Sequence, residues 1–155
     1  MSDKRKELIV SAISNGTVID HIPTETVFQV IKILGLDKTK NQVYFGTNLE
    51  SKKFGLKGII KISGKYFEHE EINKIALVAP SATLIEIRDY EVSKKSTVHI
   101  PDKVDKIVKC FNPNCITNKE DVSTRFDVFY DDNNHLKLAC HYCEKNTSKE
   151  NIVFI

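Results

Sequence analysis

Hydrophobic residues recur at a helical spacing in two segments of the first hundred residues. In TETVFQVIKILGL (24–36) they stand at i, i+3, i+4 and i+7, counted from Val27, which predicts one apolar helix face. Thr24 is a candidate N-cap and Gly35 a stop signal for this helix. EEINKIALVAP (70–80) repeats the spacing and ends in a proline. The first part of the chain therefore has two predicted amphipathic helices.

Segments rich in β-branched residues flank these helices and predict strands. The predicted strands are TVIDHIP (17–23), NQVYFGTNL (41–49), LKGIIKIS (56–63) and ATLIEIRDYEV (82–92), with ELIVSAI (7–13) as a further candidate in front. The order β-α-β-β-α-β is that of the split βαβ, or ferredoxin-like, fold. A polar, lysine-rich segment at 93–106 is the predicted linker, so we expect one domain at 1–100 and a second at 101–155.

The second part of the chain alternates apolar and polar residues on both sides of a polar tetrad. STRFDVFY (123–130) and HLKLAC (135–140) enclose Asp131–Asn134, which predicts a β-hairpin. NIVFI (151–155) is typical of a closing strand. A module of roughly this size buries too little apolar area to fold unaided, so we expect it to need a covalent or metal cross-link.

All four cysteines lie in this second part, as two close pairs. Cys110 and Cys115 stand in CFNPNC, and Cys140 and Cys143 stand in CHYC. Two such turns, each aiming two thiolates at one ion, are the usual signature of a tetrahedral Cys₄ zinc site. Two disulfides, buried free thiols and a redox CxxC are the alternatives. A redox motif leaves CFNPNC unexplained, and the charged start MSDKRKELIV indicates a cytoplasmic protein, in which persistent disulfides are rare.

Four protein ligands would leave no open coordination position, so we expect one structural Zn²⁺ per chain. The expected fold class is α+β, with an N-terminal ferredoxin-like split βαβ sandwich followed by a small antiparallel β Cys₄ zinc module. Hydrophobic residues make up 41% of the chain and charged residues 28%, which is typical of a globular protein. No apolar run approaches the roughly 18 residues of a membrane span, so no membrane partner is expected.

No catalytic set emerges from the first part of the chain. It has no glycine-rich phosphate loop and no Gly-x-Ser-x-Gly motif. Asp20 and His21 are a candidate acid–base pair, although a pair that merely caps the strand end or faces solvent is the more common explanation. Four lysines could face an anion or simply form a solvated surface: Lys57, Lys61, Lys94 and Lys95. The residues alone therefore predict no enzyme.

Several segments, taken in order, closely resemble the regulatory chain of aspartate carbamoyltransferase: GTVIDHIP, LVAPSAT, IRDYEVSKK, CFNPNCI and CHYCEK. The resemblance runs from about Leu8 to the second cysteine pair. It implies a non-catalytic chain of pyrimidine biosynthesis whose N-terminal domain binds the nucleotide effectors CTP and ATP, with UTP as a further candidate. It further implies a zinc domain that docks on the catalytic chain, and a regulatory-chain homodimer that bridges two catalytic trimers.

The resemblance also assigns residues, position by position. It implies nucleotide contacts at Val10, Ala12, Ile13, Val18, Asp20, His21, Lys57, Ile59, Lys61, Ile87, Tyr90, Val92 and Lys95. It implies catalytic-chain contacts at Asn112, Asn114, Tyr142, Glu144 and Lys145. The chain departs from the best-known members of the family at Glu7, Ser11 and Ile85, where they have a lysine, a glutamate and an asparagine. These departures leave the preference among CTP, ATP and UTP open.

Two other classes of protein are alternatives to a regulatory chain of aspartate carbamoyltransferase. A zinc ribbon that binds nucleic acid would need a basic surface. Residues 110–155 instead have five Lys/Arg and seven Asp/Glu, a net charge of −2 in a chain whose total is +2. This balance argues against a nucleic-acid partner. The second alternative is a free-standing ligand-binding regulator whose zinc module serves a different enzyme.

Overall fold

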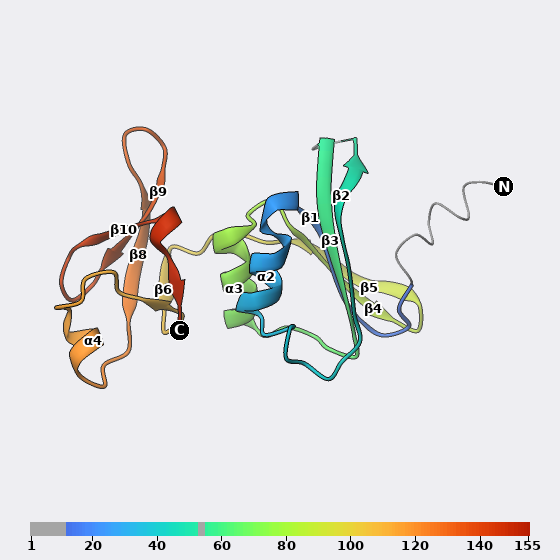
Figure 1. Cartoon of the computed structure of the whole chain (residues 1–155), viewed down its shortest axis with the longest axis horizontal. Coiled ribbons are helices and arrows are strands. Elements are labelled where there is room, and N and C mark those ends of the chain that lie inside the picture. Colours follow the sequence, from blue (N-terminus) through green and yellow to red (C-terminus); the bar gives the residue numbers. More distant parts are fainter. Residues whose placement is uncertain (1–11, 53–54) are drawn as a thin grey trace. The chain divides into compact units, whose positions relative to one another are not determined.

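The computed structural model describes residues 12–52 and 55–155 (Figure 1). The chain divides into two compact units, the first ending at His99 and the second covering Ile100–Ile155. Most of the candidate strand at 7–13 lies outside the described residues, and its last two residues belong to no regular element. Within the part that the structure describes, no helix is long and apolar enough to cross a membrane.

The first unit is a five-stranded antiparallel sheet with strand order β2-β3-β1-β4-β5 and two helices. Its elements are β1 (Gly16–Ile22), η1 (Thr24–Thr26), α2 (Val27–Ile33), β2 (Val43–Ser51), β3 (Gly55–Ser63), α3 (His69–Val78), β4 (Thr83–Arg88) and β5 (Glu91–Thr97). The sequence β1-α2-β2-β3-α3-β4 is the split βαβ arrangement, and β5 extends it at one edge. The predicted α+β fold class is confirmed.

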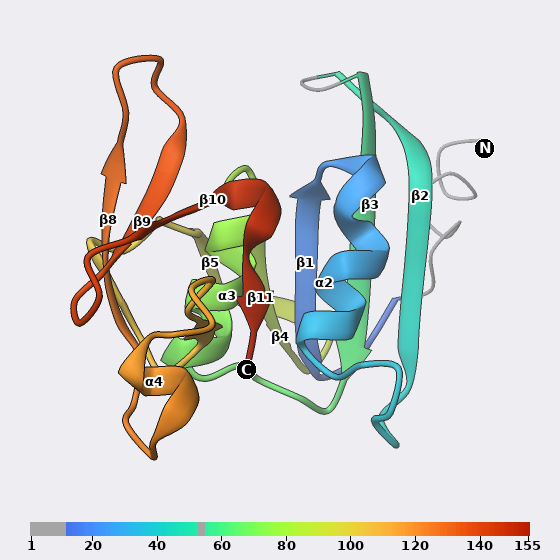
Figure 2. The ribbon, with the colours of Figure 1, turned by 60° about the vertical axis from the view of Figure 1, so that its left-hand side comes forward.

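The two helices lie side by side on one face of this sheet (Figures 1 and 2). The strand residues of that face form the core, and Ile19, Ile60 and Ile62 are fully buried. Helix α2 approaches β3 so closely that a Cβ atom on Gly58 would overlap the Val27 side chain. Because Gly58 has no side chain, α2 and β3 can pack in direct contact at this point. Among the described residues of the first unit, no helix covers the opposite face of the sheet.

The start of α2 differs from the prediction, whereas its end agrees with it. Thr24 is not the N-cap, because a 3₁₀ turn precedes the helix. Its Oγ1 instead accepts a hydrogen bond of 2.6 Å from the backbone N–H of Asn48 in β2. Gly35 ends the helix as predicted: its φ is +67° and its N–H donates to the carbonyl of Lys32.

The predicted strand ATLIEIRDYEV is in fact two strands. β4 and β5 form a hairpin around Asp89 and Tyr90, whose φ angles are 52° and 67°. Two residues with positive φ make the tight turn that suits a twisted hairpin. β5 therefore includes residues 93–97, which were expected to be linker. The prediction failed because β5 is an exposed edge strand and shows no alternation of buried and exposed residues.

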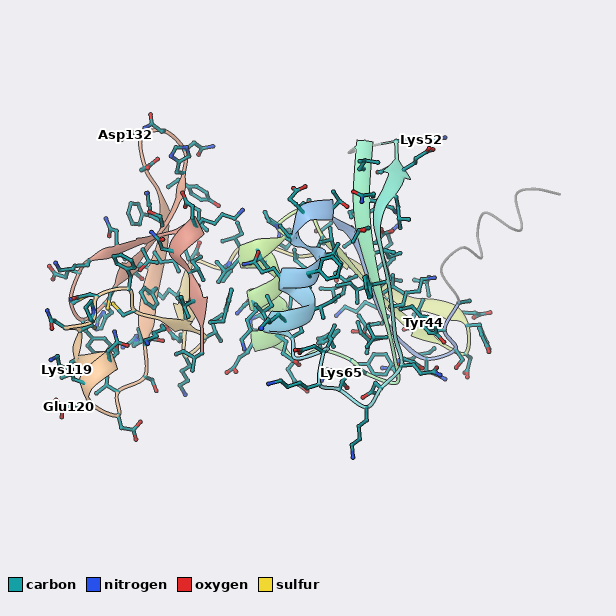
Figure 3. The ribbon with its side chains drawn as sticks, viewed as in Figure 1. Tyr44, Lys52, Lys65, Lys119, Glu120 and Asp132 are labelled. Atoms are coloured by element: carbon teal, nitrogen blue, oxygen red, sulfur yellow. The ribbon has the colours of Figure 1, made fainter. Side chains whose placement is uncertain are left out.

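The second unit is built from short antiparallel strands. Its elements are β6 (Lys103–Asp105), β7 (Val108–Lys109), α4 (Ile116–Lys119), β8 (Arg125–Tyr130), β9 (Leu136–Cys140), β10 (Asn146–Ser148), η2 (Lys149–Asn151) and β11 (Val153–Phe154). The strand orders are β10-β9-β8-β6 and β11-β7. The predicted β8–β9 hairpin is confirmed, with Asp132 at its tip (Figure 3). The predicted closing strand is shorter, and only Val153 and Phe154 pair, with β7.

Candidate functional site

The four cysteines come together in the second unit. Their sulfur atoms all lie within 4.8 Å of one another. Cys110 Sγ lies 3.6 Å from Cys143 Sγ, and Cys115 Sγ lies 3.7 Å from Cys140 Sγ. Sulfurs about 2.3 Å from a tetrahedral ion are about 3.8 Å apart, whereas a disulfide needs about 2.05 Å. The distances fit one zinc ion, and the predicted structural zinc is confirmed over two disulfides.

The first cysteine pair sits in a loop that its own polar side chains shape. Asn112 Oδ1 accepts a hydrogen bond of 3.0 Å from the N–H of Asn114, and the carbonyl of Asn112 accepts one from the N–H of Cys115. Asn118 Nδ2 donates to the carbonyls of Cys110 and Asn112, at 3.0 and 2.7 Å. Asn118 therefore ties the loop to α4, a role that the sequence analysis missed because it considered only the cysteines and the residues between them.

The second cysteine pair closes a tight turn after β9. The N–H of Glu144 donates to the carbonyl of Cys140 at 3.0 Å, and the N–H of Cys140 donates to the carbonyl of Lys145 at 3.0 Å. Glu144 has a φ of 64°, which this turn requires. The backbone N–H groups of Tyr142 and Cys143 point at the sulfur of Cys140, and that of Lys145 points at the sulfur of Cys143. Such donors stabilise thiolates, which are the form that binds zinc.

The thiols differ in how readily they ionise. Burial raises the pKa of Cys110 and of Cys140. Burial acts in the same direction on Cys143, but the backbone N–H of Lys145 and the side chain of Asn112 outweigh it and lower its pKa to about 7. Of these three thiols, Cys143 is therefore the one best prepared to lose its proton. A bound zinc ion would favour the thiolate form of all four and would hold the two loops together.

The residues assigned to catalytic-chain contact surround this metal centre. Asn112 is half-buried, and the other four are exposed: Asn114, Tyr142, Glu144 and Lys145. Two apolar side chains beside them are also exposed, Phe111 at 61% and Ile116 at 43%. The sequence analysis did not single out either residue, since only the structure shows that they face solvent. Together these side chains form an exposed, partly apolar surface beside the cysteines.

The first unit has its candidate site on the sheet face without helices. Val18 of β1 pairs with Lys61 of β3 and with Ile85 of β4, and Ile85 pairs with Lys95 of β5. Residues directly opposite one another on paired strands share a face. Ile59 follows the same alternation on β3. The departure at Ile85 therefore lies in the middle of the candidate site.

A bulge in β5 changes which of its residues share this face. On β5, Lys94 pairs with Glu86 and Val92 pairs with Ile87, so that Ser93 is an extra residue. Val92 and Lys95 consequently share a face although they are three residues apart. Lys94 lies opposite Glu86 on the other face, so it does not join the candidate site.

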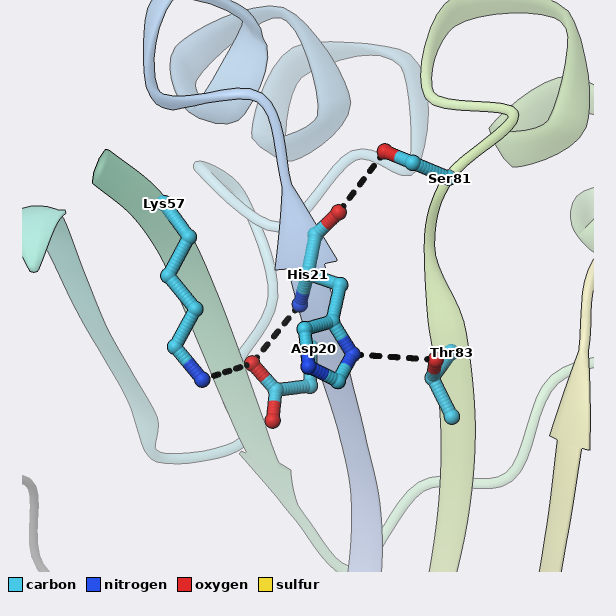
Figure 4. A network of polar contacts seen from close by, with 5 residues as sticks. All are labelled: Asp20, His21, Lys57, Ser81 and Thr83. Carbon is cyan, nitrogen blue, oxygen red and sulfur yellow. Dashed lines mark hydrogen bonds and ion pairs between the residues drawn. The ribbon is translucent and has the colours of Figure 1, made fainter. Parts of the chain in front are cut away.

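The polar centre of this face is an interaction network around Asp20 (Figure 4). The Lys57 ammonium lies 2.7 Å from Asp20 Oδ1, and both side chains are about four-fifths buried, with 20% and 17% exposed. The His21 N–H donates to the same oxygen at 2.7 Å. His21 Nδ1 lies 3.1 Å from Thr83 Oγ1. The candidate acid–base pair of the sequence analysis is therefore part of a network that spans three strands.

Lys61 of β3 adds a second, partly buried cation to this face. Burial lowers the pKa of Lys61, while attraction to the Asp20 carboxylate partly opposes this shift. A bound anion would act in the same direction as Asp20 and favour the charged lysine. Lys57, Lys61, Lys95 and His21 thus supply positive charge and hydrogen-bond donors on one face, a chemistry suited to a polyanionic ligand.

The remaining assigned residues are placed as follows. Tyr90 stands in the β4–β5 turn and is 72% exposed, and its N–H donates to the carbonyl of Ser14 at 2.9 Å. This bond ties the turn to the segment before β1, where Ala12 is exposed and Ile13 is buried. Val10 lies outside the described residues, as do Glu7 and Ser11. Thr83 contacts the His21 ring, and the hydroxyl of Ser81 donates to the His21 carbonyl. Neither residue was predicted as part of the site, because nothing in the local sequence marks it.

Comparison with known proteins covers both units. The allosteric domain of the aspartate carbamoyltransferase regulatory chain matches residues 8–99, and the metal-binding domain of that chain matches residues 102–153. A regulatory chain from Bacteroides fragilis is 52% identical over 155 residues, which is 100% of both chains. One from Pyrococcus horikoshii is 52% identical over 149 residues, covering 95% of this chain and 97% of its own.

The family members are regulatory chains with an allosteric and a metal-binding domain, so the prediction of a non-catalytic subunit is confirmed. The four clustered cysteines agree with the metal-binding domain. This chain belongs to the family of aspartate carbamoyltransferase regulatory chains.

Proposed function

We propose that this chain is the regulatory subunit of a cytoplasmic aspartate carbamoyltransferase. It binds CTP and ATP, with UTP as a further candidate, in the domain of residues 1–100, on the sheet face opposite α2 and α3. It docks on the catalytic chain through the cysteine loops of residues 101–155. The observation that supports this most strongly is that His21, Lys57, Lys61 and Lys95 share one sheet face with Asp20.

A nucleoside triphosphate fits the chemistry of that face. The lysines and His21 would interact with the phosphates, and Asp20 could accept a hydrogen bond from a ribose hydroxyl. Because Asp20 is already paired with Lys57 at 2.7 Å, the ligand would have to share or replace that ion pair. Backbone groups near Ile13 and Tyr90 would distinguish the bases. A phosphate that is held and not cleaved needs no glycine-rich loop.

Regulation would follow from unequal binding to two quaternary states. An effector shifts an equilibrium only if it binds one state better than the other. Typical coupling energies of about 1–3 kcal/mol correspond to changes of about 5- to 150-fold in affinity. The metal centre would act indirectly, by holding the cysteine loops in the shape that the catalytic chain recognises.

We also propose that the chain forms a homodimer through an edge of the first sheet. β2 and β5 are its edges. β5 presents Lys94 and Lys95, which disfavour edge-to-edge pairing, whereas β2 carries Phe45, which is 47% exposed and packs edge-to-face on Phe28. A shift to monomers in Phe45→Lys, measured by light scattering over a range of concentrations, would support the β2 edge. An unchanged dimer would exclude it.

Co-elution with the catalytic trimer of the same source tests the proposed function directly. We expect a large complex with the zinc-loaded chain and none after a thiol reagent has removed the metal. Calorimetry of CTP and ATP with the isolated chain tests the effector face separately. A zinc-loaded chain that neither assembles nor binds either nucleotide would contradict the proposal and would leave the free-standing regulator and the nucleic-acid-binding zinc ribbon to be tested.

A further inference from the structure

The segment Ile19–Ile22 in β1 departs from the alternation of a regular strand. Ile19 pairs with Ile60 and Ile22 pairs with Gly58, so that three steps on β1 match two steps on β3. This is a β-bulge, with one extra residue on β1. Ile19 and Ile22 are both fully buried in the core. Both residues between them can therefore be directed away from the core.

His21 has an uncommon backbone conformation in this bulge. Its φ is 57°, in the left-handed region that costs a residue with a side chain free energy unless its surroundings hold it there. Two hydrogen bonds hold its peptide groups (Figure 4). Its N–H donates to Asp20 Oδ1 at 2.7 Å, and its carbonyl accepts from Ser81 Oγ at 2.8 Å.

The two anchors come from different places. The bond to Asp20 is local, between adjacent residues. The bond from Ser81 comes from the turn between α3 and β4, sixty residues further along the chain. The same turn leads into Thr83, whose hydroxyl lies 3.1 Å from His21 Nδ1. Ser81 and Thr83 thus hold the backbone and the ring of one histidine.

We propose that Ser81 is a positioning residue for the effector site: its hydrogen bond to the His21 carbonyl locks the bulge that turns the imidazole toward the ligand face. The inference deepens the proposed nucleotide-binding function and rests on it. Ser81 does not need to touch the nucleotide. Without its hydroxyl, the His21 peptide would be free to take a more common conformation, and the ring would lose its orientation beside Thr83.

The surroundings of Ser81 permit a conservative test. Ser81 lines a hollow of about 460 Å³ together with Pro23, Thr24, Glu25 and Leu56. The extra methyl group of a threonine has space there, so Ser81→Thr keeps the hydroxyl, whereas Ser81→Ala removes it. Thr26→Ala is a matched control. It removes another hydroxyl that donates to a backbone carbonyl, that of Pro23 at 3.0 Å, outside the ligand face.

The binding experiment compares CTP and ATP with cytidine and adenosine, using the full zinc-loaded chain. Because His21 would face the phosphates, Ser81→Ala should weaken both triphosphates about 3- to 10-fold, the effect of losing one hydrogen bond. Both nucleosides should bind as they do to wild type, and so should all four ligands to Ser81→Thr and Thr26→Ala. Equal losses for triphosphates and nucleosides, or an unchanged triphosphate affinity in Ser81→Ala, would overturn the inference.

A double-mutant cycle distinguishes positioning from general destabilisation. If Ser81 acts through His21, Ser81→Ala should have no further effect on CTP affinity once His21→Ala is present. Independent, additive losses would contradict the proposal.

An NMR measurement without any nucleotide separates this inference from the proposed function. The nuclear Overhauser contact between the His21 ring and the Thr83 methyl group should be present in wild type and Ser81→Thr, and weakened or lost in Ser81→Ala. A retained contact in Ser81→Ala overturns the inference even if CTP and ATP bind. Wild-type protein that binds neither nucleotide overturns the proposed function instead, and the ring contact then decides the role of Ser81.

Discussion

The two units of this chain build their candidate sites in opposite ways. In the second unit, the groups that would bind the ligand are four identical side chains in two short motifs, Cys110–Cys115 and Cys140–Cys143. In the first unit, they are different side chains on β1, β3, β4 and β5, brought to one face by strand register and by bulges. The metal site therefore depends on local turns, and the effector face depends on the whole sheet. Damage to either unit should leave the other largely intact.

The largest effect is expected from Cys115→Ser, which removes one of the four sulfurs. Structural zinc contributes apparent binding free energies of about 10–16 kcal/mol in small zinc domains, so residues 100–155 should lose zinc and unfold. Metal analysis and NMR spectra of both units measure this. Binding of CTP to the first unit should persist. Loss of CTP binding together with zinc would show that the two units are not independent.

Gly58→Ala makes the opposite test of independence, because it disturbs the first unit and leaves the second unchanged. The added Cβ would overlap Val27, and such overpacking costs typically about 1–3 kcal/mol. We expect a lower unfolding midpoint for the first unit and a full complement of zinc in the second. Gly46→Ala is the matched control on the neighbouring strand, because its Cβ would meet only the flexible end of the Leu49 side chain at 3.1 Å or more. Equal destabilisation by both variants would count against close packing at Gly58.

Two adjacent lysines, Lys94 and Lys95, test whether nucleotide binding depends on the sheet face that a lysine occupies. Lys95→Ala should weaken CTP and ATP together, about 3- to 10-fold, because a phosphate contact does not distinguish bases. Lys94→Ala removes the same charge from the adjacent residue, which lies opposite Glu86 on the other face. Calorimetry should show little change for Lys94→Ala. Similar losses in both variants would mean that overall positive charge, not position on the face, governs binding.

The smallest effect concerns the tip of the β8–β9 hairpin in the second unit, away from the cysteines of that unit. Hydrogen bonds from the backbone N–H groups of His135 and Asn133, with the charges of His135 and Lys137, lower the pKa of Asp131. A carboxyl whose folded pKa is depressed contributes stability above its unfolded pKa, near 3.8, and that stability is lost as pH falls through the folded value.

Amide exchange in β8 and β9, followed from pH 5 to about pH 2, should therefore speed up on acidification in wild type beyond the intrinsic pH effect. Asp131→Asn should lack this additional dependence. The same behaviour in Asp131→Asn and wild type would assign the acid sensitivity of the hairpin to another group.

Much of the fold could be predicted from local patterns. The apolar spacing from Val27 predicted α2, and Gly35 predicted its end, because both reflect backbone preferences within a few residues. The β8–β9 hairpin and the four cysteines were also predicted, since turn residues and ligand spacings are written in contiguous sequence. The prediction that Thr24 is the N-cap of α2 was wrong, and so was the prediction of a single strand where the structure has β4 and β5. A cross-strand partner, Asn48, engages Thr24, and the turn at Asp89 and Tyr90 has no glycine to mark it.

The sequence by itself determined the two helices, the order of most strands and the four thiols that would hold a metal. Spacing and composition could not decide between Lys94 and Lys95 or place Asp20 and His21 on the same side of β1, and the strand register of the tertiary structure does both. The physical reason is that a bulge is defined by pairing with another strand, since one extra residue shifts every later side chain to the opposite face. The hydroxyl of Ser81 and the close approach of Val27 to Gly58 likewise exist only after distant segments have packed together.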